Sequence, residues 1–311
     1  TPAGVIGIAD QVKETTPAAL AALRKEGIEV IMLTGDNQVT AAAVAAGLGP
    51  IAVSTDGAGS SRIPASCCGI LGMKGTLGLI SNDYWPARFE NYSSASMNAR
   101  TVADLASLLS IMNGPGARDP WTMGQPQRSY PLAADPVSLL DGLRVTYVPR
   151  MGNRLVDQSV TTLIDITLAK LEDAGATVSI LQPGFDWNLD LSGAIIGATL
   201  YARLAEVTET HRGQISPYLT QVIEAGRALS ADAVKYAPLE RTKLFDRVND
   251  LFNKADLLVM PTLAAPAPKY DHDHGDPIVI NGEDGGSLRE GWYPYTRPFN
   301  LTGHPAISIP I

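Results

Sequence analysis

The sequence predicts an α/β protein in which helices cover both faces of a central mixed sheet. Short apolar runs that resemble strands alternate with longer segments of helical periodicity, an order typical of layered α/β/α folds. Hydrophobic residues make up 45% of the 311 residues and charged residues 18%, enough apolar material for a substantial core. Neither an internal repeat nor a low-complexity segment interrupts this pattern.

The first segment, Gly4 to Asn37, has the pattern of a β-α-β unit. Val5 to Ala9 is a short apolar strand, and Ile28 to Leu33 is a second one. Between them, Ala18 to Lys25 follows a Thr-Pro pair that can start a helix, and Gly27 can end it. Such a unit predicts two parallel strands joined by a crossover helix.

The stretch from residue 51 to residue 79 carries the chemical signal. An apolar strand that begins at Ile51 leads into the small-residue loop Gly57-Ala58-Gly59. Ser60 follows the loop, and Pro64 stands near the expected first turn of a helix. A loop of this kind can direct several backbone N–H groups to one point beside a nucleophile, as an acyl-transfer site requires.

The rest of the chain continues the alternation. Apolar residues recur at helical spacing from Arg100 to Met112, and a Pro-rich surface connection follows over residues 117 to 139. The further elements that the pattern predicts are a strand at 143–148, a helix at 160–174, a strand at 176–181, helices at 194–210 and 231–253, and a short buried strand at 257–260.

Two motifs around Ser60 resemble the amidase signature family. Ser54 to Ala65 reads STDGAGSSRIPA, and Cys68 to Thr76 reads CGILGMKGT, close to the family patterns G-T-D-x-G-G-S-I-R-I-P-A and C-G-x-x-G-x-K-P-T. The family nucleophile falls on Ser60. The departures are Ser54 and Ala58 for glycines, Ser61 for an aliphatic residue and Gly75 for proline.

Three later segments extend the resemblance. Ser96 to Ala106 is similar to the family's G-P-M-x-R-T-V-A-D-A segment, with Ser96 and Asn98 as departures. Asp256 to Pro268 and Tyr293 to Ile311 are similar to its D-x-L-L-x-P-T and F-N-x-T-G-x-P-A segments. The resemblance implies that residues 41 to 311 form one amidase-signature core with an α/β/α fold, truncated at both ends relative to the family.

The first forty residues resemble a different family. The sequences IADQVK and MLTGDN within Gly4 to Asn37 are similar to the phosphorylation domain of heavy-metal P-type ATPases. The pump's D-K-T-G-T motif is absent from the chain, and no apolar run of about twenty residues is present to span a membrane. We therefore expect a fusion of a P-type-ATPase-like segment, residues 1 to 40, to an amidase core, without transport activity.

The join affects the catalytic residues that the resemblance implies. The family uses a serine–serine–lysine triad, and the position of its bridging serine falls here on Asp36. Two loop glycines of the family fall on Gln38 and Val39. No lysine is identified as the base: Lys13 faintly echoes the family's lysine, but the ATPase-like pattern explains it as a solvated lysine near a turn.

The resemblance implies a serine amidohydrolase. Ser60 would attack an amide, anilide or carbamate carbonyl, while the N–H groups of Gly57, Ala58, Gly59 and Ser60 itself hold the oxyanion. Urethanase and aryl-acylamidase specificities both remain open, and so does an amidotransferase subunit. The competing hypothesis is a catalytically impaired fusion or scaffold that keeps the amidase core without its lysine and bridging serine.

Substrate choice is expected from two variable segments, Asn82 to Asn98 and Phe185 to Leu219. Their aromatic residues could form an apolar acyl or aryl pocket or could be ordinary core residues; these residues are Tyr84, Trp85, Phe89 and Trp187.

Several classes of protein are excluded or disfavoured. The net charge of −8 and the lack of a basic cluster disfavour a nucleic-acid partner. Cys67 and Cys68 are adjacent, so they exclude a disulfide scaffold, and we expect them to pack as small apolar residues. The residues Asp271 to His274 are expected to form a solvated loop and not a metal site. We expect no cofactor, no membrane contact and a cytoplasmic location, with the oligomeric state open.

Overall fold

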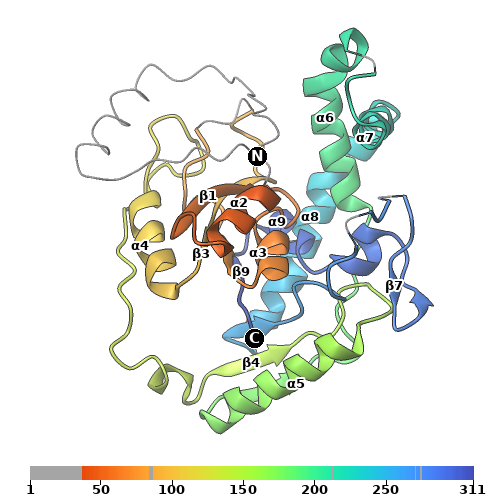
Figure 1. Cartoon of the computed structure of the whole chain (residues 1–311). Helices are drawn as coiled ribbons and strands as arrows, with labels where there is room; N and C mark the ends of the chain where they lie inside the picture. The colour runs from red at the N-terminus through yellow and green to blue at the C-terminus, as the bar shows by residue number, and fades with distance from the viewer. Residues whose placement is uncertain (1–36, 84–86, 212, 270, 274) are drawn as a thin grey trace, which may run out of the picture.

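The computed structural model describes residues 37–83, 87–211, 213–269, 271–273 and 275–311 (Figure 1). The predicted β-α-β unit lies almost entirely outside these residues, as do Lys13, Asp36, Tyr84, Trp85 and His274. The first described element is helix α2 (Asn37–Ala45), which lies in the alanine-rich stretch of the sequence.

A four-stranded antiparallel sheet forms the first half of the molecule. Its strands are β1 (Ile51–Asp56), β3 (Ser94–Ala99), β2 (Leu71–Lys74) and β9 (Ala306–Ser308), adjacent in that order. Because strand side chains alternate between faces, the two faces differ in chemistry. The apolar face, with Met97 at its centre, packs on α4 (Val102–Met112).

The opposite face of this sheet is polar. Asp56 pairs with Ser94, and Ser96 lies between Ser54 on one neighbouring strand and Lys74 on the other. Helix α3 (Arg62–Cys68) packs against β2 and α2, where buried Ala65 joins a small apolar cluster. The strand-loop-helix unit expected around Ser60 is thus present, with polar groups buried beneath it.

A three-stranded parallel sheet lies in the second half. Its central strand, β4 (Arg144–Tyr147), pairs with β5 (Thr177–Ile180) and β6 (Leu257–Val259). Helix α5 (Gln158–Asp173) packs on it through Ile164 and Leu168. The described strands therefore supply both antiparallel and parallel pairs, but in separate sheets joined by the core and not in one hydrogen-bonded ladder.

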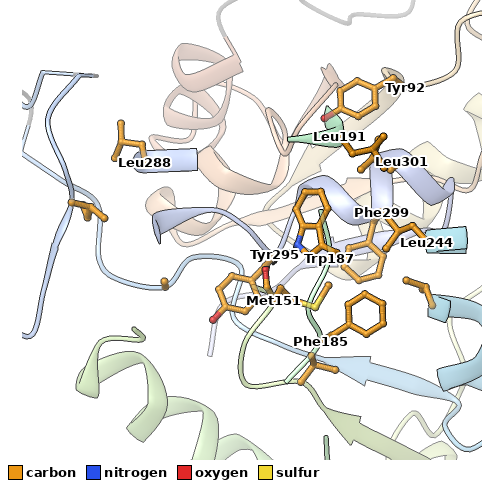
Figure 2. Close-up of a cluster of buried hydrophobic side chains, with 14 of the residues drawn as sticks. Tyr92, Met151, Phe185, Trp187, Leu191, Leu244, Leu288, Tyr295, Phe299 and Leu301 are labelled. Atoms are coloured by element: carbon orange, nitrogen blue, oxygen red, sulfur yellow. Dashed lines mark hydrogen bonds between the residues drawn. The ribbon is translucent and has the colours of Figure 1, made fainter. Parts of the chain in front are cut away.

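The largest apolar cluster joins the two halves (Figure 2). Trp187 and Phe299 lie near its centre, with Tyr92 at one edge. Helix α8 (Ala231–Phe252) contributes Leu244 and Val248, and α9 (Arg297–Thr302), which is buried along its whole length, contributes Phe299. Because α9 contacts α8 and precedes β9, it connects this cluster to the antiparallel sheet.

Helices α6 (Leu191–Thr210) and α7 (Pro217–Arg227) form a pair that extends from the body (Figure 1). They approach so closely at Gly197 and Gly226 that a Cβ on Gly226 would overlap the Gly197 carbonyl. The predictions missed α7, although Ser216 caps it and Pro217 starts it, a standard helix-start signal.

The remaining predicted elements are present with small shifts, but the strand predicted to be buried at 257–260 is not buried: in β6, Leu257 is exposed and the next two residues are only half-buried, because β6 is an edge strand of its sheet. The predicted helix from residue 100 begins at Val102 because Thr101 acts as its N-cap and accepts a hydrogen bond from the Asp104 N–H. The other described elements are a hairpin of β7 (Val279–Ile280) and β8 (Glu283–Asp284), a 3-10 turn η1 (Ser138–Leu140) and a π-turn η2 (Leu288–Trp292). None of the described helices combines the length and apolarity needed to cross a bilayer.

Candidate active site

Ser60 is an exposed residue between strand β1 and helix α3. The loop before it is held from below by the carboxylate of Asp56, the last residue of β1. The N–H of Gly59 donates to Asp56 Oδ1 at 2.7 Å, and the N–H of Ser61 approaches Oδ2 at 3.4 Å. These bonds on either side of Ser60 fix the backbone that carries its hydroxyl.

Asp56 is itself held by a buried arginine. Arg62 places Nε 2.9 Å from Asp56 Oδ2 and Nη2 2.9 Å from Oδ1, and both side chains are almost fully buried. Burial alone would raise the pKa of Asp56, but the charge and hydrogen bonds of Arg62, with help from Asn300, lower it to about 2. The carboxylate is therefore ionised at neutral pH.

Helix α9 closes the loop from the other side. Thr296, immediately before α9, donates to the Ala58 carbonyl at 2.5 Å, and its own carbonyl accepts from Arg62 Nη1 at 2.9 Å. Asn300 donates to the Asp56 carbonyl at 2.8 Å. Gly59 has φ +114°, and a Cβ there would overlap Thr296. Only glycine fits this turn without displacing α9.

The adjacent serine, Ser61, is in a different environment. It is fully buried, and its hydroxyl lies 3.2 Å from Asn98 Oδ1. Ser54 donates to the same oxygen at 3.1 Å, while Asn98 Nδ2 donates to the Ser61 carbonyl at 3.2 Å. Three departures from the family pattern, far apart in sequence, thus form one hydrogen-bond cluster. Ser60 is the exposed hydroxyl of the pair, and Ser61 anchors α3 to the sheet.

The loop offers backbone donors to a developing oxyanion. Within the described part of the chain, the N–H groups of Gly57, Ala58 and Ser60 have no hydrogen-bond acceptor. The N–H of Gly59, which the sequence analysis included among the oxyanion donors, is directed to Asp56 instead. The role of Gly57, Ala58 and Ser60 as oxyanion donors stays a prediction. Gly59 instead shapes the loop through its bond to Asp56.

Lys74 is a titratable group that the sequence analysis gave no role. Its ammonium is buried, and Nζ donates to the Gly75 carbonyl at 2.8 Å. Burial and, secondly, the charge of Arg62 lower the pKa of Lys74 to about 7, against the opposing effect of Asp56. The feature of the sequence that could have identified Lys74 is its position at the end of a buried strand. It can exchange a proton near neutral pH.

The expected aromatic residues lie in different places. Phe89 is 82% exposed, so neither core packing nor an enclosed pocket describes it. Trp187 is buried, donates from Nε1 to the Met151 carbonyl at 2.9 Å, and has the Arg297 guanidinium 5.0 Å from its ring centre. The structure thus assigns Trp187 to the core and leaves Phe89 on the surface.

The cysteines also differ from expectation. Cys67 is exposed, so the prediction that it packs as an apolar residue was wrong, because the outer face of α3 turns it to solvent. Cys68 is half-buried beside the cluster under α3. Cys67 is exposed as a whole, but the protein around its sulfur partly excludes water, and this desolvation, with the neighbouring Cys68 adding to it, raises the pKa of Cys67 to about 11. Among the described residues, no group of three or more His, Cys, Asp or Glu converges on one point.

Comparison with known proteins agrees with this geometry. A family profile described as Amidase matches residues 40–311. A second profile, described as haloacid dehalogenase-like hydrolase, matches residues 1–63 and so overlaps the first. The overlap covers α2, β1 and the Ser60 loop.

Individual relatives carry amide-hydrolase names. The chain is 34% identical over 283 residues to an acylamidase of Rhodococcus erythropolis, covering 89% of this chain and 57% of that protein. It is 28% identical over 334 residues to a 6-aminohexanoate-cyclic-dimer hydrolase of Pseudomonas sp. (strain NK87), covering 96% and 63%.

A solved structure shares the fold. A bacterial aryl acylamidase of the amidase signature enzymes superimposes with a TM-score of 0.72 at 28% identity, over 86% of this chain and 57% of that one. The chain spans about three fifths of the length of the relatives it matches. The match over residues 40–311, together with the strand-loop-helix geometry around Ser60, shows that this chain belongs to the amidase family.

Proposed function

We propose that the protein is a serine amidohydrolase that cleaves a C–N bond of a small amide, anilide or carbamate through an acyl-enzyme on Ser60. The observation that carries the proposal is the exposed Ser60 hydroxyl on a loop fixed by Asp56, Arg62 and α9. Because the fold already fixes this loop, little conformational entropy is lost in orienting the Ser60 hydroxyl when substrate binds.

The reaction divides into two steps. Ser60 Oγ adds to the carbonyl carbon, and the N–H groups of Gly57, Ala58 and Ser60 stabilise the oxyanion; each such donor lowers the barrier by about 3 kcal/mol. The tetrahedral intermediate then releases the amine, which takes up a proton, and leaves the acyl group on Ser60. Water adds to this ester and releases the acid, which restores the Ser60 hydroxyl.

The reaction also needs a group that accepts the Ser60 proton and returns it to the amine. The family's positions for this task fall on Asp36 and, by a weaker correspondence, on Lys13, both outside the described residues. Within the described part, Lys74 has a pKa of about 7, matched to proton exchange at neutral pH. We keep Asp36, Lys13 and Lys74 as candidates for this role.

The second candidate function is a scaffold that keeps the fold but not the chemistry. The observation that favours it is the sequence at the join, where Asp36 replaces a serine. We also propose that residues 1 to 40 have a separate origin from the amidase core, supported by the two overlapping family matches. Sequencing across the junction in the source DNA tests this origin: two separate reading frames would refute a natural fusion.

Hydrolysis of matched anilide and carbamate substrates tests the enzyme against the scaffold. We expect release of aniline by the wild-type chain, loss of it in Ser60→Ala, and retained turnover in Ser61→Ala, because only the Ser60 hydroxyl is exposed. A folded wild-type chain without turnover supports the scaffold. A preference for carbamates over anilides would assign the urethanase specificity, and the reverse preference the aryl-acylamidase one.

A further inference from the structure

Buried side-chain atoms without a hydrogen-bond partner in the described part of the chain include Tyr92 Oη and Arg297 Nε, and also Ser94 Oγ on strand β3. Tyr92 is 8% exposed and Arg297 is 3% exposed, so bulk water does not satisfy either group. Leaving a buried donor unpaired is unfavourable, which calls for an explanation in a native fold.

Tyr92 lies at the edge of the cluster in Figure 2, where it is drawn beside Leu191 and Leu301. Burial raises the pKa of Tyr92, and the charge of Arg297 is the largest effect opposing this rise. Ser192 links them further, because its hydroxyl lies 2.9 Å from Arg297 Nη1 and approaches the Tyr92 hydroxyl closely enough to oppose the rise in the pKa of Tyr92, although the two hydroxyls do not meet in hydrogen-bond geometry. The phenol and the guanidinium are therefore neighbours.

Arg297 also makes no ion pair in the described structure, although burial lowers its pKa and the charge of Glu290 is among the effects that oppose this. No carboxylate lies within ion-pair distance of it there. Its Nη atoms donate to the Leu189 and Arg289 carbonyls at 3.1 and 2.6 Å, and its plane lies 5.0 Å from the ring centre of Trp187. These contacts orient the guanidinium, but they supply no negative charge. An isolated buried charge is costly unless an anion joins it.

The site is connected to the Ser60 loop through α9. Asn300 Nδ2 donates to the Tyr92 carbonyl at 3.3 Å and to Asp56 Oδ1 at 3.0 Å. Thr296, the neighbour of Arg297, holds the Ala58 carbonyl. One short helix therefore positions both the nucleophile loop and the unpaired donors, as expected where a single ligand meets both.

We propose that Tyr92 and Arg297 bind a carboxylate of the substrate, carried on the part of the molecule remote from the bond that is cleaved. A carboxylate fits because it is acceptor-only and can take the Tyr92 O–H and the Arg297 Nε–H while neutralising the guanidinium. The proposal rests on the amidohydrolase function proposed above. It narrows the substrate class to amides that also bear an acid group.

The test compares two substrates that differ only in charge, N-phenylglutaramic acid and its primary amide. In the wild type we expect kcat/KM to be at least tenfold higher for the acid. Tyr92→Phe and Arg297→Gln should reduce this ratio to near one, mainly through KM, because the lost donors act on a remote group. An unchanged ratio in Tyr92→Phe overturns the proposal, since the two atoms would then enclose only an ordered water.

Tyr295→Phe is the matched control. Tyr295 is buried in the same cluster, but its hydroxyl donates to the Pro149 carbonyl and accepts from Asn153 Nδ2, both at 2.9 Å. We expect Tyr295→Phe to lower the thermal midpoint and to leave the substrate ratio unchanged. Tyr92→Phe removes an unpaired hydroxyl, so its midpoint should hold or rise. Tyr92→Phe therefore keeps the test valid even if Arg297→Gln does not fold.

Calorimetry in a Ser60→Ala background separates the two proposals. There the acid should bind at least tenfold more tightly than its amide, and Tyr92→Phe should abolish the difference. Selective binding without turnover by the wild type would contradict the proposed function and leave the carboxylate site standing. Turnover of the primary amide with equal binding of both ligands would contradict the carboxylate site alone.

Discussion

Helix α9 contacts the loop before Ser60 and also carries Arg297. The two regions differ in how their buried arginine is paired. Arg62 makes a two-bond ion pair with Asp56 and adds further bonds to Thr296 and Asn300. Arg297 has carbonyl and aromatic contacts without an anion in the described structure. The paired Arg62 network thus fixes the loop before Ser60, whereas the surroundings of Arg297 leave a donor that a ligand can use.

The largest effect on this comparison should come from Arg62→Leu. The substitution leaves the Asp56 carboxylate buried without its cation, and breaking a buried pair in this way costs about 3–5 kcal/mol. Urea denaturation measures the loss. Arg144→Leu is the control, because the Arg144–Asp256 pair at 2.6 Å is exposed and solvent screens it. Equal losses in the two variants would mean that the Asp56–Arg62 pair has no special structural role.

A smaller effect is expected from Gly59→Ala. The residue has φ +114°, and its new Cβ would overlap Thr296 and Ile63, so the loop must shift at a cost of about 1–3 kcal/mol. Turnover should fall more steeply than stability, since the loop carries Ser60. Gly69→Ala tests the backbone effect alone, because Gly69 has φ +66° with no atom near the added Cβ. Matching losses of turnover in both variants would contradict the contact between the loop and Thr296.

The third effect concerns pH. The pKa of Lys74 falls from 10.5 to about 7 in the folded chain, so between these values the unfolded state binds more protons. The contribution of Lys74 to stability therefore rises with pH from about 7 toward 10.5. We expect Lys74→Met to remove this rise when urea midpoints are compared at pH 7 and pH 9.5. An identical pH dependence in the variant and the wild type would show that Lys74 stays charged.

The local features of the site could be predicted from the sequence. The strand, the glycine loop and the helix after Ser60 lie within a few residues of one another, so short-range patterns specify them. The same holds for α4, α5 and α8, whose periodicity is strong. Helix α7 was missed although Ser216-Pro217 marks its start and its apolar residues recur at helical spacing, so the sequence did carry the signal.

The contacts that complete the site could not be predicted, because they join distant parts of the chain. Thr296 and Ala58 are 238 residues apart, and Asn300 and Asp56 are 244 apart. Departures from the family pattern at Ser54, Ser61 and Asn98 looked independent in the sequence, whereas the sheet register brings them together. The unpaired state of Tyr92 and Arg297 depends on every neighbour at once, which no local pattern records.

The measurement that tests the central claim most directly is labelling of the wild-type chain with a fluorophosphonate, read by intact mass, beside Ser60→Ala and Ser61→Ala. The account predicts one adduct in the wild type and in Ser61→Ala, and none in Ser60→Ala, because an activated hydroxyl is required and, of these two serines, Ser60 is exposed and Ser61 is buried. An adduct that persists in Ser60→Ala, or folded wild-type protein that takes up no label, would contradict Ser60 as the nucleophile.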